Sequence, residues 1–226
     1  MKKRTAVIGV LVSLLPFGQP LLIGTVAVLT SAAVMLTVPN QAKAESAVSY
    51  FNQGNFKFKV EDYYGAIADY SKAIEIDPRY VKAYYNRGLS KERLEDYEAA
   101  IADYSKAIEI DPKFNDAYYN RGSVKDNLED YYGAIADYSK AIEINPSYAK
   151  PYNNRCYVKR RFLKDYYGAI SDCLIAKDLD PNNFNPYINL GFAKKQLGDM
   201  KGACADWRQA SYLGHEKSSQ RVRNEC

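Results

Sequence analysis

The chain has 226 residues, with 31 Lys and Arg, 27 Asp and Glu, one His and four Cys. Four of the basic residues precede the first acidic residue, Glu45, so residues 45–226 carry 27 charges of each sign. This balance argues against broad electrostatic binding of nucleic acid, and a single His leaves little material for His-based metal sites or acid–base catalysis. The sequence also has no evident nucleophile–base pair, phosphate-binding Gly loop or metal-ligand cluster, so we expect a non-catalytic protein without a cofactor or metal.

Residues 1–44 have the pattern of an export signal. Basic residues at positions 2–4 precede a long apolar segment that is free of charge up to Lys43, and small residues at positions 42 and 44 end it. We therefore expect a secretory signal peptide that is cleaved before Glu45. The alternative is an uncleaved N-terminal membrane anchor, since residues 21–38 are just long enough to cross a bilayer. With basic residues before the apolar segment, both alternatives predict that the remainder is exported, to a periplasm or a thylakoid lumen.

The rest of the chain is one motif repeated. Residues 62–78 read DYYGAIADYSKAIEIDP, and residues 130–146 are identical except at one position. A fixed period of this length is typical of stacked units, each of which buries its apolar face against its neighbours. The prolines that close the copies are spaced by 34, 34 and 35 residues: Pro78, Pro112, Pro146 and Pro181.

Within each copy a small residue is followed by Ala twelve residues later and by a second Ala seven residues beyond, and Pro closes the first four copies. The fourth copy contains one inserted residue before Ala169. This spacing and period resemble the tetratricopeptide repeat. The resemblance implies an all-α fold, a right-handed superhelical solenoid of about five helix-turn-helix repeats with a short C-terminal capping helix. The expected domains are residues 47–80, 81–114, 115–148, 149–183 and 184–217 for the repeats and residues 215–226 for the cap.

All four cysteines lie in the last two copies and the cap that follows them. An even number of cysteines in an exported chain favours disulfides, and four cysteines allow three pairings. Cys156 and Cys173 lie at similar distances on either side of a predicted turn near Lys164, and Cys204 and Cys226 do so about the turn before the cap. We therefore predict the pairs Cys156–Cys173 and Cys204–Cys226. The alternative is four buried, reduced thiols that pack as small apolar residues.

An Asn recurs in every copy, two positions before the small residue. In a regular stack these side chains form a row along the concave face, where an amide can bind both polar groups of an extended peptide backbone. Tetratricopeptide repeat proteins that bind long unstructured peptides, such as the O-linked N-acetylglucosamine transferases, have a similar asparagine ladder, so the resemblance implies a groove of this kind. The alternative is that Asn satisfies local backbone groups. The predicted ladder is Asn52, Asn86, Asn120, Asn154 and Asn189.

Aromatic and basic residues near the ladder are further candidates for contact with a partner. Tyr85 and Tyr119 stand next to ladder positions and suit a binding surface. Arg160 and Arg161 follow Lys159 at the densest basic point of the chain and are candidates for an acidic partner; the alternative is a solvated charged face. The acidic residues of the motif ADYSKAIEID are expected at outward helix positions. Other positions beside the ladder are Phe51, Asn153, Tyr157, Ile188 and Phe192.

These patterns favour a non-catalytic protein–protein interaction adaptor that binds an extended protein segment in its concave groove, in an exported compartment. The alternative is a membrane-anchored structural scaffold that associates with itself. We expect a protein or an extended peptide as the partner, no nucleic acid, and membrane contact only through an uncleaved N-terminal segment. A homo-oligomer is compatible with both functions.

Overall fold

The computed structural model describes the backbone of residues 31–226 and the side chains of residues 45–226. The chain divides into two units, Met1–Pro39 and Asn40–Cys226, and the repeated motif lies in the second. The predicted signal peptide or anchor lies outside the residues whose side chains are described. Among the described residues, no helix combines the length and the apolar character that a membrane span requires.

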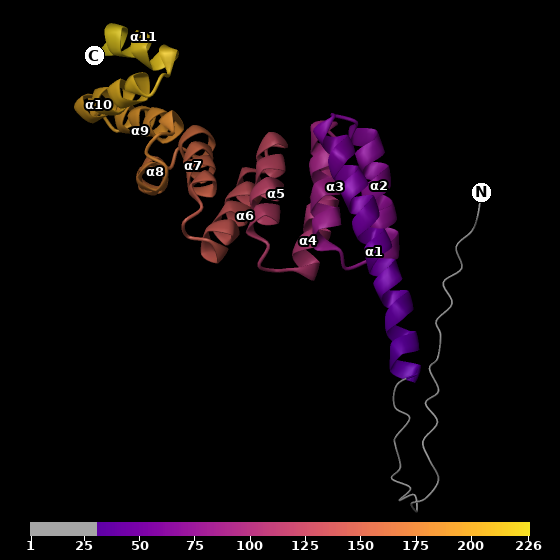
Figure 1. Ribbon diagram of the computed structural model, residues 1–226. Coiled ribbons are helices and arrows are strands. Elements are labelled where there is room, and N and C mark those ends of the chain that lie inside the picture. The colour runs from indigo at the N-terminus through magenta and orange to yellow at the C-terminus, as the bar shows by residue number, and fades with distance from the viewer. Residues whose placement is uncertain (1–30) are drawn as a thin grey trace, which may run out of the picture. The chain divides into compact units, whose positions relative to one another are not determined.

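Helices form all the regular structure of residues 31–226, and no strand occurs there (Figure 1). The helices are α1 Ser31–Lys59, α2 Tyr63–Ile76, α3 Val81–Arg93, α4 Tyr97–Ile110, α5 Asn115–Asn127, α6 Tyr131–Ile144, α7 Ala149–Val158, the π-helix η1 Lys159–Leu163, α8 Tyr166–Leu179, α9 Phe184–Gln196, α10 Met200–Tyr212 and α11 Glu216–Glu225.

The helices pack in chain order as pairs. Helix α3 packs against α4, α5 against α6, α7 against α8 and α9 against α10, and each pair also packs against the next. We call α1 and α2 repeat one, α3 and α4 repeat two, α5 and α6 repeat three, α7, η1 and α8 repeat four, and α9 and α10 repeat five. Helix α11 packs on α10. The described part of the chain is therefore an all-α solenoid of helix-turn-helix repeats, as the sequence predicts.

Local sequence signals set the limits of the second helices. The Asp62 side chain accepts a hydrogen bond of 2.9 Å from the Gly65 backbone N–H and so caps the start of α2. Helix α2 ends at Ile76, two residues before Pro78, because a residue that precedes Pro disfavours the helical conformation. The same cap and the same end recur in α4 and α6.

The core of each repeat forms where a small residue of the first helix meets a large residue of the second. A Cβ atom added to Gly122 would lie 2.9 Å from a ring atom of Tyr138, which is fully buried. The close approach of the two helices therefore requires glycine at this position. Equivalent contacts join Gly54 to Tyr70, Gly88 to Tyr104 and Gly191 to Trp207.

Repeat four replaces this contact with a disulfide. Cys156 and Cys173 occupy the positions of the small and the large residue, and they are bonded with their Cα atoms 5.5 Å apart. Cys204 and Cys226 form a second disulfide, with a Cα separation of 5.7 Å, which ties the end of the chain to α10. Both are the pairs that the sequence predicts.

The inserted residue of repeat four is accommodated by the π-helix η1. Helix α7 continues directly into η1, and Lys164 follows it with a φ of 55°. Glu61, Glu95 and Glu129 have φ values of 60° to 63° at the corresponding turns of repeats one to three. A π-turn holds one residue more than an α-turn. The connection to α8 therefore keeps the left-handed turn residue of the other repeats.

The first Asp of the segment ADYSKAIEID is buried, which corrects the expectation that the acidic residues of this segment lie at outward helix positions. Asp103 is 4% exposed and accepts hydrogen bonds of 2.9 and 2.6 Å from Arg87, while Lys91 forms an ion pair with it at 2.7 Å. Arg87 also donates to Ser71 of the preceding repeat at 3.0 Å, so the cluster joins two repeats. The same cluster recurs as Ser105, Arg121, Lys125 and Asp137, and as Ser139, Arg155, Lys159 and Asp172.

Candidate functional site

The predicted asparagine ladder lies on the first helices of the repeats. We call the surface formed by α1, α3, α5, α7 and α9 the first-helix face. Asn52 is exposed on α1 and lines a surface cavity of about 390 Å³ together with Gln53 and Phe56. Asn86 on α3 lines a second cavity of about 180 Å³, between repeats one and two. These two members of the ladder are therefore accessible to a ligand.

The amide groups of the ladder also bond to the preceding repeat. Asn86 donates a hydrogen bond of 2.8 Å to the side-chain oxygen of Asn55, and Asn120 donates one of 2.7 Å to the hydroxyl of Tyr85. Asn154 donates in the same way to Tyr119 at 3.4 Å. These bonds join neighbouring repeats through side chains. They differ from the alternative considered for these asparagines, which was that they satisfy local backbone groups. Each of these asparagines therefore has a role in the stack besides any contact with a partner.

Tyr85 and Tyr119 pack as part of the stack. The ring centroid of Tyr85 lies 5.8 Å from that of Tyr104 and 4.9 Å from that of Phe114, at the start of the next repeat. Burial raises the pKa of Tyr85 to about 12. Tyr119 makes the equivalent ring contacts with Tyr138 and Tyr148. Both rings thus bridge adjacent repeats.

A cavity of about 400 Å³ between repeats four and five brings together four of the predicted site residues. Asn154 and the two arginines come from α7 and η1, and Asn189 comes from α9. The other predicted positions, in repeats one to three, lie elsewhere on the first-helix face. The full lining is Asn153, Asn154, Tyr157, Arg160, Arg161, Asn185, Ile188, Asn189 and Phe192.

One short side chain accounts for this opening. Repeats two and three have Tyr85 and Tyr119 at the position three before the small residue, and repeat four has Asn153 there. An Asn side chain cannot reach across to the next repeat as a tyrosine ring does. Its oxygen Oδ1 is buried and has no hydrogen-bond partner. The ladder residue of repeat five, Asn189, therefore has no tyrosine hydroxyl to bond, and it accepts a hydrogen bond of 3.2 Å from Arg160 instead.

Arg160 is held between polar and aromatic groups. Its guanidinium carbon lies 5.6 Å from the ring centroid of Tyr157 and 4.9 Å from that of Phe192, which are cation–π distances. Burial lowers the pKa of this guanidinium, and the nearby charge of Arg161 lowers it further. The arrangement holds the positive charge of Arg160 beside the cavity, although burial removes part of the hydration of its guanidinium.

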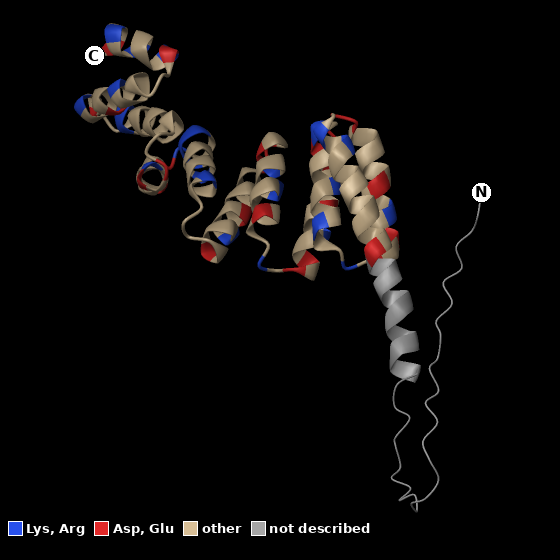
Figure 2. Cartoon of the chain, in the orientation of Figure 1, with Lys and Arg blue, Asp and Glu red and all other residues tan. Residues whose placement is uncertain are grey.

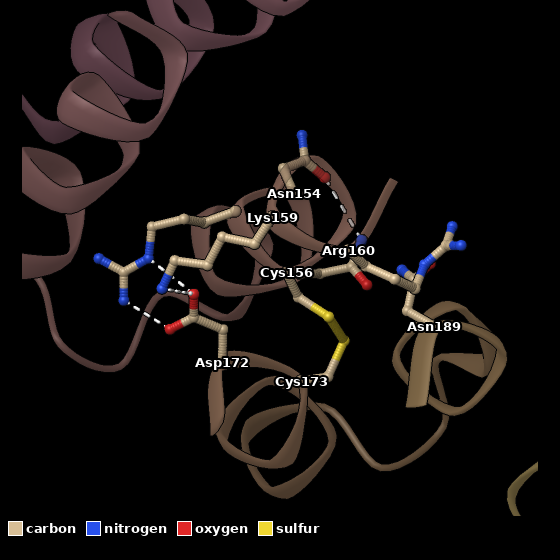
Figure 3. The surroundings of a disulfide bond; sticks show 9 residues. Asn154, Cys156, Lys159, Arg160, Asp172, Cys173 and Asn189 are labelled. Atoms are coloured by element: carbon tan, nitrogen blue, oxygen red, sulfur yellow. Dashed lines mark hydrogen bonds and ion pairs between the residues drawn. A yellow bond between two sulfur atoms is a disulfide. The ribbon is translucent and has the colours of Figure 1, made fainter. Parts of the chain in front are cut away.

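The consecutive basic residues Lys159 and Arg160 lie on opposite sides of the Cys156–Cys173 disulfide. Lys159 forms an ion pair of 2.8 Å with Asp172 on one side, and Arg160 meets Asn189 on the other (Figure 3). The ion pairs found among residues 45–226 include Lys159 but neither Arg160 nor Arg161. Residues 149–226 contain 14 basic and 8 acidic residues, and the basic ones are spread over α7 to α11 (Figure 2). Of the residues that line the cavity, Arg160 and Arg161 are the basic ones, and neither forms an ion pair with residues 45–226.

Sequence reasoning did not identify two features of this cavity. Asn185, at the start of α9, carries no signal that distinguishes it from other polar residues of the helix. The inserted residue before Ala169 is the only sequence signal for the π-helix that carries Arg160, and it does not by itself indicate a π-helix. Among residues 45–226, no group of three His, Cys, Asp or Glu side chains is arranged to hold a metal ion.

Comparisons with known proteins support the repeat assignment. Residues 81–114 and 116–148 match the family described as tetratricopeptide repeat, and residues 54–95 match a second family described as TPR repeat. No curated protein matches the chain.

Several solved structures share the fold. The crystal structure of the MamA protein is 23% identical, with a TM-score of 0.69 over 80% of this chain and 97% of that one. YrrB, described as a TPR protein with an unusual peptide-binding site, is 22% identical, with a TM-score of 0.68 over 85% and 98%. PilF of Pseudomonas aeruginosa is 16% identical, with a TM-score of 0.70 over 81% and 88%. The repeat spacing, the paired helices and these matches agree: residues 54–148 are tetratricopeptide repeats, and the described part of the chain has the fold of tetratricopeptide repeat proteins.

Proposed function

We propose that this protein is a non-catalytic adaptor that binds an extended segment of another protein on its first-helix face. The observation that carries the proposal is the cavity between repeats four and five, where amide, guanidinium and aromatic groups from two repeats converge. Such a mixture of aromatic rings and polar handles suits the recognition of a polypeptide. Cavities at Asn52 and Asn86 extend the same face toward the start of the chain. The peptide-binding site for which YrrB is described supports this use of the fold.

We further propose that the protein acts in an exported compartment. Its two disulfides support this, because disulfides persist in oxidising compartments and are rare in the cytosol. The basic and apolar pattern of residues 1–44 supports it independently. The periplasm and the thylakoid lumen both fit these observations.

The proposal is tested by selecting linear peptides from a random library on the purified protein and measuring their Kd by fluorescence anisotropy. Ile188 lines the cavity, so Ile188→Trp fills it and is expected to weaken binding by about tenfold, the equivalent of roughly 1.4 kcal/mol. Ile175, which is 39% exposed on α8, offers the matched control, and Ile175→Trp is expected to leave Kd unchanged.

Two results would contradict the proposed function. One is the failure of every linear peptide to bind the intact protein. The other is an equal effect of the two tryptophan substitutions, which would show that binding does not use the first-helix face.

A further inference from the structure

We propose that the cavity between repeats four and five binds a carboxylate group of the bound segment, with Arg160 and Arg161 as its cationic partners. This inference rests on the proposed function and specifies the chemistry of the segment. The carboxylate belongs to an Asp or Glu side chain or to the end of a polypeptide, and the experiment below distinguishes the two.

The cavity exists because repeat four departs from the pattern of the repeats before it. Tyr85 and Tyr119 close the corresponding space in repeats two and three, and each hydroxyl accepts a hydrogen bond from the next ladder residue. Asn153 leaves the space open, with about 400 Å³ of cavity in its place. The partnerless oxygen of Asn153 is a buried acceptor at the edge of this space, and a backbone N–H of a bound segment would satisfy it.

The donor groups that line the cavity match a carboxylate. Arg160 uses its Nε atom to bond Asn189, which leaves its terminal amino groups for a second partner. A guanidinium binds a carboxylate through paired N–H donors. Arg155 forms such a pair with both oxygens of Asp172, at 2.9 and 2.6 Å, through its Nε and Nη2 atoms. Because the Nε of Arg160 already bonds Asn189, Arg160 would use its two terminal amino groups instead. Rings on both neighbouring helices restrict the motion of Arg160, so little side-chain entropy is lost when a ligand binds.

The charge of the cavity lacks an internal counter-ion. Its nine lining residues include two arginines and no Asp or Glu. Burial and the charge of Arg161 both lower the pKa of Arg160, and a bound anion would offset both effects. Arg160 lies four residues after the small residue of its repeat, and the equivalent positions in repeats two and three are Glu92 and Asp126. This position of the first helices therefore changes from acidic in repeats two and three to basic in repeat four, which favours an acidic group of the ligand here.

The test uses the peptides selected on the intact protein. Each Asp or Glu of a peptide is replaced in turn by Asn or Gln, and its C-terminal acid is compared with the amide. We expect one of these neutral peptides to bind the wild-type protein at least tenfold more weakly than its charged parent. A loss on changing a side chain identifies an internal carboxylate, and a loss on amidation identifies a chain end.

Variants of the protein then link this carboxylate to the cavity. With Arg160→Gln or Arg161→Gln, the charged and the neutral peptide are expected to bind within about twofold of each other. Asn153→Tyr, which restores the residue of repeats two and three, is expected to abolish the same preference. Arg79→Gln, at an exposed loop position, is the matched control and should keep the full tenfold difference.

The outcomes separate the two proposals. If linear peptides bind but every neutral version retains full affinity, the carboxylate site is refuted while the adaptor function stands. The carboxylate site is also refuted if the preference persists in both arginine variants. If no linear peptide binds, both proposals fail. Should Asn153→Tyr disturb folding, as judged by circular dichroism, Arg161→Gln still decides the matter, because Arg161 is an exposed residue that makes no ion pair within residues 45–226.

Discussion

Repeat four can be converted to the pattern of its neighbours, and this conversion tests what the Cys156–Cys173 disulfide does. In the first variant both cysteines are replaced by Ala. The disulfide closes a loop with a sequence separation of 17 residues, and removing such a constraint from the unfolded chain costs about 3 kcal/mol. We expect the free energy of unfolding of Cys156→Ala/Cys173→Ala to fall by about this amount.

The second variant, Cys156→Gly/Cys173→Tyr, supplies the contact that repeat three makes between Gly122 and Tyr138. Tyr138 is fully buried, and the burial of a side chain of this size contributes roughly 2 kcal/mol. The Gly/Tyr variant is therefore expected to recover most of the loss and to lie about 1 kcal/mol below the wild type.

Urea unfolding followed by circular dichroism, with all proteins oxidised, measures the three stabilities. Repeats can unfold separately, and a single urea transition would then average their stabilities. Amide hydrogen exchange of α7 and α8 measures the stability of repeat four alone. If the Ala variant were as stable as the wild type, the stabilisation attributed to the disulfide would be refuted. A Gly/Tyr variant less stable than the Ala pair would refute the structural equivalence of the two contacts.

Three further changes test other parts of the stack. Glu129 has a φ of 63°, so Glu129→Gly should raise the free energy of unfolding by about 1 kcal/mol, whereas Glu129→Ala, which keeps Cβ, should give no gain in urea titrations. Asp137→Ala leaves the partly buried guanidinium of Arg121 without its carboxylate and should destabilise the protein by about 3 kcal/mol in thermal melts; a change below about 1 kcal/mol would contradict this. Burial raises the pKa of Tyr70 and Tyr85 from 10.0 to about 12, so the unfolded chain releases these protons first. Stability is therefore complete below pH 10 and declines as the pH rises toward about 12, which phenolate absorbance and circular dichroism would follow together; full phenolate release by the folded protein at pH 10 would be inconsistent with this.

Much of the fold follows from spacing alone. The regular prolines mark where second helices end, and Asp62 and its equivalents mark where they begin, so the helix pairs of the structure agree with the sequence. The disulfide pairs are also predictable, because residues equally far from a turn lie level on antiparallel helices. These features depend on local sequence and on the simple geometry of a hairpin.

The remaining features depend on contacts between distant side chains. Asp103 looks like an exposed acidic residue in its own helix, and its burial is stabilised by Arg87 and Lys91 of the preceding helix. The ladder predicts which residues share a face, but not that Asn120 and Asn154 bond to tyrosines of the preceding repeat. Replacing several ladder residues by Ala would therefore remove contacts within the stack as well as any contacts with a partner.

The π-helix η1 also bears on how a chain built by duplication tolerates changes in length. An added residue in a continuous helix turns all later residues by about 100° about the helix axis. Because η1 takes up the added residue before α8 begins, Asn189 stays in phase with the asparagines of earlier copies. A gene of tandem copies can thus gain a codon at this point and acquire a chemically distinct segment, while the later copies keep their alignment with the earlier ones.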